Sequence, residues 1–279
     1  ASSAPEILIE HIASATSRIR VGSGGIMLPN HAPLRIAEVF HTLETLHPGR
    51  IDLGVGRAPG TDPVTSRALR PFDAEQFPQQ LTELIGLSRG ALAPDHPFRT
   101  VKVIPSGVSL PPVWILGSSG ASARFAGSLG VGYAFARHFS PAPPEPAVRA
   151  YLESFQPSAQ LAEPHAILGV SVICADTDEE AEHLASSIDL VWARYQRGEF
   201  GTLPSPEEAT SYPWTPHERT IADAGRSRHF IGRPAAVAAQ IRAVARSTGA
   251  SEIMVTSMIY NHADRLRSYE LLANAAWSE

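Results

Sequence analysis

Two short stretches of this 279-residue chain carry side chains that could hold a phosphate ester. In GVGRAPG, residues 54–60, Arg57 follows two glycines, and a guanidinium can pair with a phosphate through two hydrogen bonds. In LGSSGAS, residues 116–122, a helix-like pattern begins at a turn built from four small residues: Gly117, Ser118, Ser119 and Ser122. The unpaired N–H groups and the dipole of a helix N-terminus favour an anion there. Each stretch alone fits a surface ion pair or a serine-capped turn, and the two together favour a phosphate site.

The motifs around these turns narrow the class of ligand. Neither turn matches the six-residue dinucleotide fingerprint or a nucleotide P-loop with its lysine. A phosphate site without those motifs indicates a mononucleotide or a phosphorylated small molecule. Gly22, Gly24 and Gly25 fall within four residues, and backbone without side chains can lie against a flat ring. A β-bulge or a crowded corner of a barrel would use the same glycines.

Other kinds of site find little support. None of the 11 histidines pairs with an acid at metal-ligand spacing, so we expect no metal site, and we interpret His31, His138 and His262 as structural or solvated side chains near strand ends. The single cysteine, Cys174, lies in an apolar run, which suits a reducing, cytoplasmic compartment. The net charge is −5 without a basic block, and no apolar stretch approaches the roughly 18 residues of a membrane span. Neither nucleic acid nor a membrane is therefore an expected partner.

Strand-like and helix-like segments alternate along the chain and must position these turns. Six short, apolar segments predict strands, at 18–25, 50–57, 112–117, 131–139, 165–175 and 252–257. Helical patterns lie between and after them, at 33–46, 72–90, 122–130, 145–155, 176–196, 234–249 and 262–277. Such alternation predicts a parallel sheet, open or closed into a barrel, with ligands at the carboxyl ends of the strands. Six strands would not close the usual eight-stranded barrel.

The chain also opens directly into a helical pattern. We expect Ser3 to cap this helix and Pro5 to occupy its first turn. Its apolar residues recur at helical spacing: Ile7, Leu8 and Ile12.

Two segments depart from the alternation of strands and helices. Residues 91–111 are rich in proline and serine and are predicted as a loop or a small hairpin. Residues 198–228 show no period and contain several prolines. A loop of this length is usually functional or mobile, and we interpret it as a lid or insertion loop.

Several of these segments, taken in order, resemble the bacterial luciferase-like monooxygenases, a flavin-dependent superfamily. The resemblance is carried by residues 18–60, with RIRVGSGG and GVGRAPG, and by residues 111–139, with WILGSSGAS. Further similarity lies in ADTDEEAEHLA at 175–185 and FIGRPAAVAAQI at 230–241. It extends over most of the chain and is weakest over the predicted lid. It is specific for the superfamily and not for a substrate.

The resemblance implies a single domain over residues 1–279 with the (β/α)8 TIM-barrel fold, binding FMN at the carboxyl ends of its strands. The six predicted strands then correspond to the third to the eighth, so we expect a strand–helix–strand unit before Ala1 and an N-terminally incomplete sequence. The family's active-site histidine would lie in that preceding part. The catalytic residue therefore stays unknown, and no histidine of this chain is assigned to replace it.

Carried over to this chain, the family pattern implies seven cofactor-binding residues. Arg57 would meet the flavin phosphate together with the turn residues Gly117, Ser118, Ser119 and Ser122. Two further residues, Gly24 and Gly25, would lie beneath the isoalloxazine, where relatives often have a non-prolyl cis peptide, and we predict one there.

The substrate side is inferred from positions at strand ends. We expect it to be lined by Phe135, His138, Phe139 and Met258. Two departures from true luciferases matter: Gly56 stands where they have a cysteine, and Ser118 where they have an acidic residue. Light emission from a fatty aldehyde is therefore not implied.

The function implied is that of a flavin-dependent monooxygenase, which uses reduced FMN and O2 to oxidise a small organic substrate. A separate flavin reductase would supply the reduced FMN, because no nicotinamide domain is visible, and a homodimer is left open. Three alternatives remain: a deazaflavin-dependent oxidoreductase on the same fold, a flavin-binding protein without catalysis, and a phosphosugar enzyme on a plain barrel.

Overall fold

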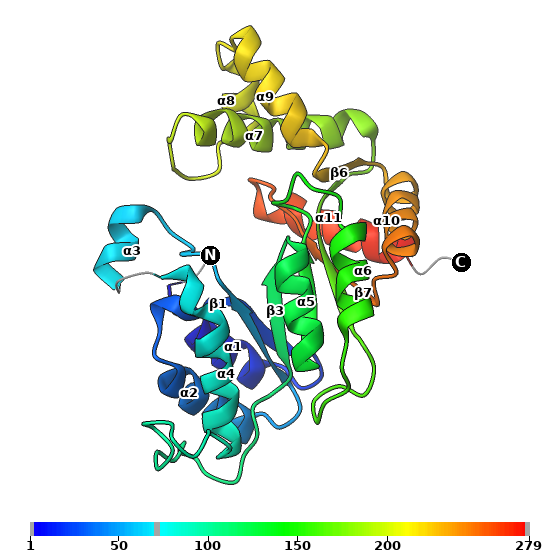
Figure 1. Cartoon of the computed structure of the whole chain (residues 1–279). Helices are drawn as coiled ribbons and strands as arrows, with labels where there is room; N and C mark the ends of the chain where they lie inside the picture. The colour runs from blue at the N-terminus through cyan, green and yellow to red at the C-terminus, as the bar shows by residue number, and fades with distance from the viewer. Residues whose placement is uncertain (1–2, 70–72, 277–279) are drawn as a thin grey trace. The chain divides into compact units, whose positions relative to one another are not determined.

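A computed structural model describes residues 3–69 and 73–276 and shows an α/β chain in which the paired strands run parallel (Figure 1). The predicted class of fold, α/β with a parallel sheet, is confirmed at this level. The chain divides into two compact units, one made of Ala1–Ala134 with Ala150–His165, the other of Phe135–Arg149 with Ala166–Glu279. Strand β4 (Gly132–Ala136) and helix α6 (Glu145–Ser154) each contribute residues to both units.

Three parallel strands form the sheet of the first unit: β1 (Val21–Met27), β2 (Ile51–Gly56) and β3 (Val113–Gly117). The register pairs Met27 with Gly56, and Gly56 with Leu116. Since the strands are parallel and end in register, the loops that follow them leave from one edge of the sheet. The two turns singled out in the sequence therefore lie on neighbouring strands.

Four helices cover this sheet: α1 (Pro5–Ala15), α2 (Pro33–Leu46), α4 (Phe77–Arg89) and α5 (Gly120–Leu129). Helix α1 packs on β1 and α5 on β3, and Figure 1 shows α2 beside α4. Phe40, Leu53 and Leu84 are fully buried between these layers. Shorter elements fill the connections: η1 (Leu28–Asn30), α3 (Pro63–Leu69) and η2 (Ala74–Gln76).

The N-terminal helix is present, and Pro5 occupies its first turn as predicted, but the expected cap is wrong. Its N-cap is Ala4, so Ser3 does not cap it. Ile9 and Ala13 are its buried residues, whereas the three residues noted for their helical spacing are exposed: Ile7, Leu8 and Ile12. The helix carries two apolar stripes at helical spacing, and spacing alone does not tell which of them packs on β1.

The second unit is built around a long strand, β5 (Ala166–Cys174). Its first half pairs with β7 (Glu252–Thr256) and its last four residues pair with β6 (His229–Gly232). Three long helices pack on these strands: α7 (Asp178–Gln196), α10 (Pro234–Thr248) and α11 (His262–Ala276). Ile173 of β5 packs with Leu184 and Ile188 of α7 in the core.

Seven strands, not six, occur in the described part of the chain. The missed strand, β6, has only four residues and stands directly before the helix that Pro234 begins, so its pattern is too short to show a period. The loop over 91–111 is present, without the hairpin, because no strand is found there among the described residues. Residue 72, the first residue of the helix predicted at 72–90, lies outside the described residues.

The prediction that 198–228 lacks structure is also wrong. It contains two helices, α8 (Pro206–Ser211) and α9 (Pro216–Arg226), which lie against α7 (Figure 1). Each begins with a hydroxyl residue, a proline and a glutamate at the third helical position; at α9, Thr215 and Glu218 form a complete capping box. These signals were present in the sequence, and the prolines that suggested a loop mark helix starts instead.

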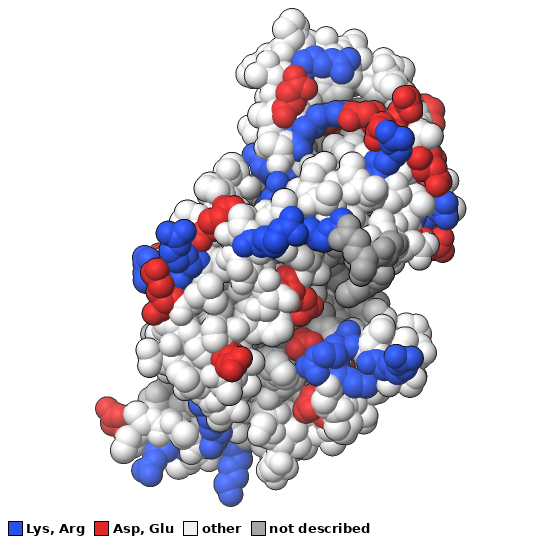
Figure 2. Space-filling view, turned by 90° about the vertical axis from the view of Figure 1, so that its right-hand side faces the viewer, with Lys and Arg blue, Asp and Glu red and all other residues white. Residues whose placement is uncertain are grey.

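Ion pairs fasten these helices to α7. Arg194 of α7 pairs with Glu208 of α8 at 2.6 Å, Arg226 of α9 donates to Asp189 of α7 at 2.7 Å, and Arg197 pairs with Glu218 of α9. Hydrogen bonds from the Thr215 backbone and hydroxyl and from the Tyr212 hydroxyl lower the pKa of Glu218 to about 2. On the face drawn in Figure 2, basic and acidic side chains are interspersed in the same way. None of the described helices is both long and apolar enough to cross a membrane.

Candidate functional site

Arg57 lies at the carboxyl edge of the first unit's sheet, directly after β2. Its side chain is exposed and makes no hydrogen bond or ion pair with any residue in 3–69 or 73–276. Because Gly56 is in register with Leu116, Arg57 and Gly117 follow neighbouring strands at the same level. The guanidinium is therefore available to an anion bound at the turn after β3.

The turn after β3 is a serine-capped helix start. Ser119 is the N-cap of α5 and accepts the Ser122 N–H at 3.4 Å, while the Ser122 hydroxyl donates to the Ser119 carbonyl at 2.9 Å. The helix begins at Gly120, two residues earlier than predicted. The N–H groups of Gly120 and Ala121 and the Ser118 hydroxyl have no partner in the described part of the chain. The capping explanation is thus correct, and it still leaves three donors free.

The close packing of this turn requires glycine at its first position. A Cβ on Gly117 would lie 2.3 Å from the Ser122 Oγ and 2.9 Å from its Cβ. Beneath the turn, the Tyr133 hydroxyl donates to the Ser119 carbonyl at 3.4 Å. Burial raises the pKa of Tyr133 to about 12, so this phenol stays protonated and keeps donating at neutral pH.

The glycines of β1 bring two backbones into contact. A Cβ on Gly25 would lie 2.7 Å from the Gly54 carbonyl oxygen, and a Cβ on Gly54 only 2.0 Å from the Ser23 oxygen. The register shifts between Ser23 and Ile26, so the bulge considered from the sequence is present. On Gly24 nothing lies within 4 Å of the Cβ position, which leaves an open backbone surface. The Gly24–Gly25 peptide is cis, and that prediction is confirmed.

A second guanidinium at this edge was missed from the sequence. The Arg124 side chain folds back along α5, and its Nη1 lies 3.4 Å from the Cβ position of Gly120. The side chain is exposed and donates to no other described residue. The signal was its place four residues, one helical turn, after Gly120, because helical side chains lean toward the N-terminus.

The four residues expected on the substrate side all belong to the second unit. Phe135 is buried, whereas Phe139 is 67% exposed and stacks on His138 with ring centroids 4.3 Å apart. The His138 Nδ1 lies 3.2 Å from the Gly169 carbonyl, and burial lowers the pKa of His138, so its ring is neutral and donates from Nδ1. Met258 follows β7 on a separate segment. The structure therefore brings His138 and Phe139 together and buries Phe135 away from solvent.

No group of three or more His, Cys, Asp or Glu side chains in the described ranges is arranged to hold a metal ion. Cys174 is buried, and burial raises the pKa of its thiol to about 11, so it remains a neutral thiol. Its backbone N–H donates to Ser268 within the core.

Comparison with known proteins identifies similar chains. The family model described as luciferase-like monooxygenase matches residues 3–252. The uncharacterized protein YvbT of Bacillus subtilis is 50% identical, over 98% of this chain and 81% of its own length. A luciferase-like monooxygenase of Escherichia coli K12 is 41% identical, over 97% and 81%. The N-acetyl-S-alkylcysteine monooxygenase of B. subtilis is 31% identical, over 99% and 83%.

Solved structures agree with this assignment. Apo-MsnO8 superposes with a TM-score of 0.82 at 38% identity, covering 97% of this chain and 82% of that one. Two more distant structures, which bear on the fold alone, are TIM-barrel proteins. The oxygenating constituent of a Pseudomonas putida 3,6-diketocamphane monooxygenase, in complex with FMN, gives 0.66 at 19% identity, over 97% and 81%. An F420-dependent secondary alcohol dehydrogenase gives 0.68 at 11% identity, over 99% and 84%.

Proposed function

This chain belongs to the luciferase-like monooxygenase family, a family of oxidoreductases, and from that premise we propose that it is an FMN-dependent monooxygenase. Reduced FMN comes from a separate flavin reductase, and O2 and a small organic molecule are the substrates. Two similar proteins support this choice: one structural neighbour is a monooxygenase in complex with FMN, and one relative is an N-acetyl-S-alkylcysteine monooxygenase. Family membership likewise supports the closed (β/α)8 barrel.

One observation carries the proposal. Arg57 and Arg124 both lie at the edge where the N-terminus of α5 begins, and neither has a partner in the described chain. A helix N-terminus carries about half a positive charge, so two more cations beside it are unfavourable unless an anion joins them. A dianionic phosphate ester supplies that anion and accepts from the free N–H groups and the Ser118 hydroxyl.

The remaining cofactor residues have matching roles. Ser119 and Ser122 shape the helix start, and Gly117 lets the turn pack closely enough for its N–H groups to face the ligand. The open side of Gly24 offers flat backbone to the isoalloxazine, with Gly25 packed against β2 behind it. When bound, the reduced flavin supplies the electrons with which one oxygen atom of O2 enters the substrate. The chain's own work is to bind and orient the cofactor and to exclude water.

The second unit is proposed to serve the substrate. His138 and Phe139 offer an aromatic surface, and Met258 is exposed on another segment of the unit, whereas the buried Phe135 can only support them from behind. Helix α9, held to α7 by Arg226, and helix α8, held to α7 by the Arg194–Glu208 pair, form the proposed lid and would move with α7 as one body. A homodimer remains compatible with this assignment.

A deazaflavin coenzyme is the second candidate, because one structural neighbour is F420-dependent. A direct test titrates the purified protein with FMN and with F420, then supplies each reduced coenzyme with and without O2 and with N-acetyl-S-methylcysteine as a first substrate. The proposal expects tighter binding of FMN and a product whose new oxygen derives from labelled O2. Tighter binding of F420, with turnover in the absence of O2, would contradict it.

A further inference from the structure

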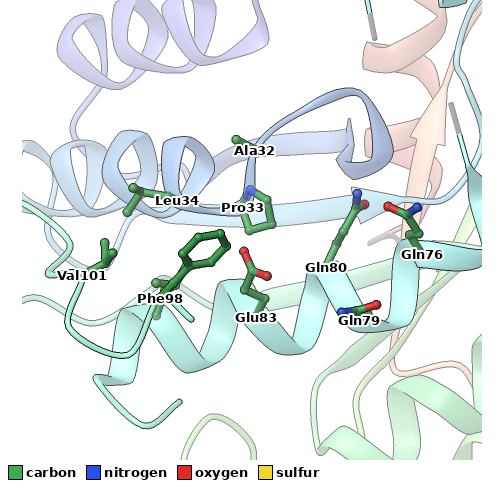
Figure 3. A pocket seen from close by; sticks show the side chains of 10 residues that line it. Ala32, Pro33, Leu34, Gln76, Gln79, Gln80, Glu83, Phe98 and Val101 are labelled. Atoms are coloured by element: carbon green, nitrogen blue, oxygen red, sulfur yellow. The ribbon is translucent and has the colours of Figure 1, made fainter. Parts of the chain in front are cut away.

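The first unit contains a cavity of about 470 Å³ that shares no residue with the candidate phosphate site (Figure 3). It lies between the start of α2 and the face of α4 that carries Gln80, Glu83 and Leu87, and residues of the segment after α4 complete its wall. Its lining combines one acid, three amides and an apolar wall: Glu83; Gln76, Gln79 and Gln80; Ala32, Pro33, Leu34, Leu87, Phe98 and Val101. A volume of this size suits a small organic ligand.

The polar side of the cavity has acceptors that lack donors. Gln80 is only 8% exposed, and its Oε1 is buried without a hydrogen-bond partner. The Glu83 side chain is 16% exposed and accepts no hydrogen bond from the described residues. The Gln80 oxygen is costly to leave unpaired, and the Glu83 carboxylate, which is only partly buried, is the acceptor open to a donor from outside the chain.

His96 lies beside the Glu83 carboxylate and does not donate a hydrogen bond to it. The His96 Nδ1 accepts the Phe98 N–H at 3.2 Å, which places the ring proton of the neutral imidazole on Nε2. That Nε2 lies 3.7 Å from the Glu83 Oε2, beyond hydrogen-bond distance. A ligand with an N–H donor can therefore form a hydrogen bond with the Glu83 carboxylate without displacing an existing one.

The apolar side of the cavity adds an aromatic ring to these acceptors. Phe98 is 48% exposed and lines the cavity together with Glu83, whose carboxylate rises toward Pro33 in the view of Figure 3. A carboxylate, an amide oxygen and an aromatic ring are the three groups that bind an ammonium ion by charge, hydrogen bond and cation–π attraction. Leu34 and Val101 can cover the hydrocarbon part of the same molecule.

We propose that this cavity is a binding site for a small organic ammonium ion with an apolar body, held by Glu83, Gln80 and Phe98. The ammonium group donates to the Glu83 carboxylate, and rotation of the Gln80 side chain would bring its unpaired oxygen to the same group. Its apolar body lies against Phe98, Leu34 and Val101. The site is independent of the proposed flavin chemistry, because none of its residues lies at the edge formed by Arg57 and α5.

Isothermal titration calorimetry of the purified protein at pH 7.5 tests the proposal with three matched probes. These are 2-phenylethylamine, the neutral 2-phenylethanol and the anionic 3-phenylpropanoate. We expect saturable binding of the amine at one site, at least tenfold tighter than the alcohol, with no binding of the carboxylate. Glu83→Gln should weaken the amine at least tenfold, whereas Glu75→Gln, the same change at an exposed residue outside the cavity, should leave it unchanged.

A second variant separates loss of the site from loss of the fold. Ala32→Trp places a large side chain at the cavity wall, at an exposed position, and should abolish amine binding while FMN titration and the unfolding temperature stay as in the wild type. Equal affinity for amine and alcohol, or full amine binding by both Glu83→Gln and Ala32→Trp, would overturn the proposal. Neither result would bear on the FMN site, whose titration is read separately.

Discussion

At the scale of single residues, two guanidinium groups define the candidate cofactor site. Arg57 and Arg124 come from different elements, and neither is neutralised by an acid in the described chain. Some exposed arginines elsewhere are paired, as Arg267 is with Asp176 and Arg20 with Asp52, and others, such as Arg89 at the far end of α4, are unpaired among the described residues as well. What distinguishes Arg57 and Arg124 is their shared place at the edge where α5 begins. Two unpaired cations at one helix N-terminus are consistent with an anionic ligand and not with a network that stabilises the fold.

Arg57→Ala should weaken FMN binding without unfolding the protein. The lost interaction is a charge-assisted hydrogen bond, worth about 1.5–3 kcal/mol, so the dissociation constant should rise roughly 10- to 100-fold. Quenching of flavin fluorescence measures it. Arg89→Ala removes an equally exposed and unpaired arginine at the far end of α4 and should bind FMN normally; equal affinities of both variants with the wild type would remove Arg57 from the site.

Sequence reasoning reached Arg57 and Ser119 because each belongs to a turn whose glycines and hydroxyls stand together in the chain. It missed Arg124, which becomes a neighbour of Gly120 only through the helical turn between them. It also missed Gln80, because an unpaired amide oxygen is a property of packing and leaves no trace in residue type.

At the scale of elements, α5 shows how one residue can serve the fold and the ligand together. Ser119 caps the helix through its hydroxyl, and the same turn presents the free N–H groups of Gly120 and Ala121. Aspartate is as good an N-cap as serine, and its charge suits the helix dipole. A substitution can therefore keep the element and change only its attraction for an anion.

Ser119→Asp should retain the unfolding temperature and lose FMN. The introduced carboxylate keeps the cap but repels the phosphate from the start of α5. Ser119→Asn is the matched control, since it caps equally well without a charge and should keep most of the affinity. Differential scanning fluorimetry with and without FMN reads both properties, and the idea fails if FMN raises the unfolding temperature of the aspartate variant as much as that of the wild type.

His229 on β6 makes the second unit sensitive to acid. Its Nε2 accepts the Trp192 Nε1–H at 3.2 Å, so the proton is on Nδ1, which donates to the Ser171 hydroxyl at 2.8 Å. Burial, followed by the nearby positive charges of Arg228 and Arg137, lowers the pKa of His229 to about 4. Between pH 6.5 and 4 the unfolded chain therefore binds more protons than the folded one, and stability falls as the pH falls.

We expect this histidine to remove about 2 kcal/mol of unfolding free energy between pH 7.5 and pH 5. Urea unfolding at the two pH values measures it. His229→Asn should be less stable at pH 7.5, where it loses its hydrogen bonds, but should lose less stability on acidification. His217→Asn, a change at an exposed histidine of α9, should keep the wild-type pH dependence; a slope in His229→Asn equal to that of His217→Asn would contradict the assignment.

The elements themselves were predicted where a period runs long enough to be recognised. The helix at 33–46 has the predicted bounds, and β2, β3 and β5 lie within one residue of theirs. Two of the missed elements are short, since β6 has four residues and α8 six, too few for a period to be visible. Helix α9 has eleven residues and was missed because the prolines around it were interpreted as a loop. The signals for α8 and α9 were the pairs Ser205–Pro206 and Thr215–Pro216, in which a capping residue precedes a proline. These prolines mark helix starts and were interpreted as loop residues.

At the scale of the whole molecule, family membership and the site point to one function by separate routes. The family model and the relatives come from overall similarity along the chain. The candidate phosphate site is inferred separately, from the positions of Arg57, Arg124 and the start of α5 in one unit. An FMN-dependent member of this family needs a site for the flavin phosphate. The guanidinium groups and free N–H groups at the start of α5 lack an anionic partner in the described chain, and the flavin phosphate would supply it.

The wild-type affinity for FMN compared with riboflavin, which differs only by the phosphate, tests the account most directly. Fluorescence titration of both flavins under identical salt measures the contribution of the phosphate alone. Two charge-assisted contacts of about 1.5–3 kcal/mol each predict that FMN binds at least roughly 100-fold more tightly than riboflavin. Equal dissociation constants for the two flavins would show that no phosphate is held at the edge formed by Arg57 and the start of α5.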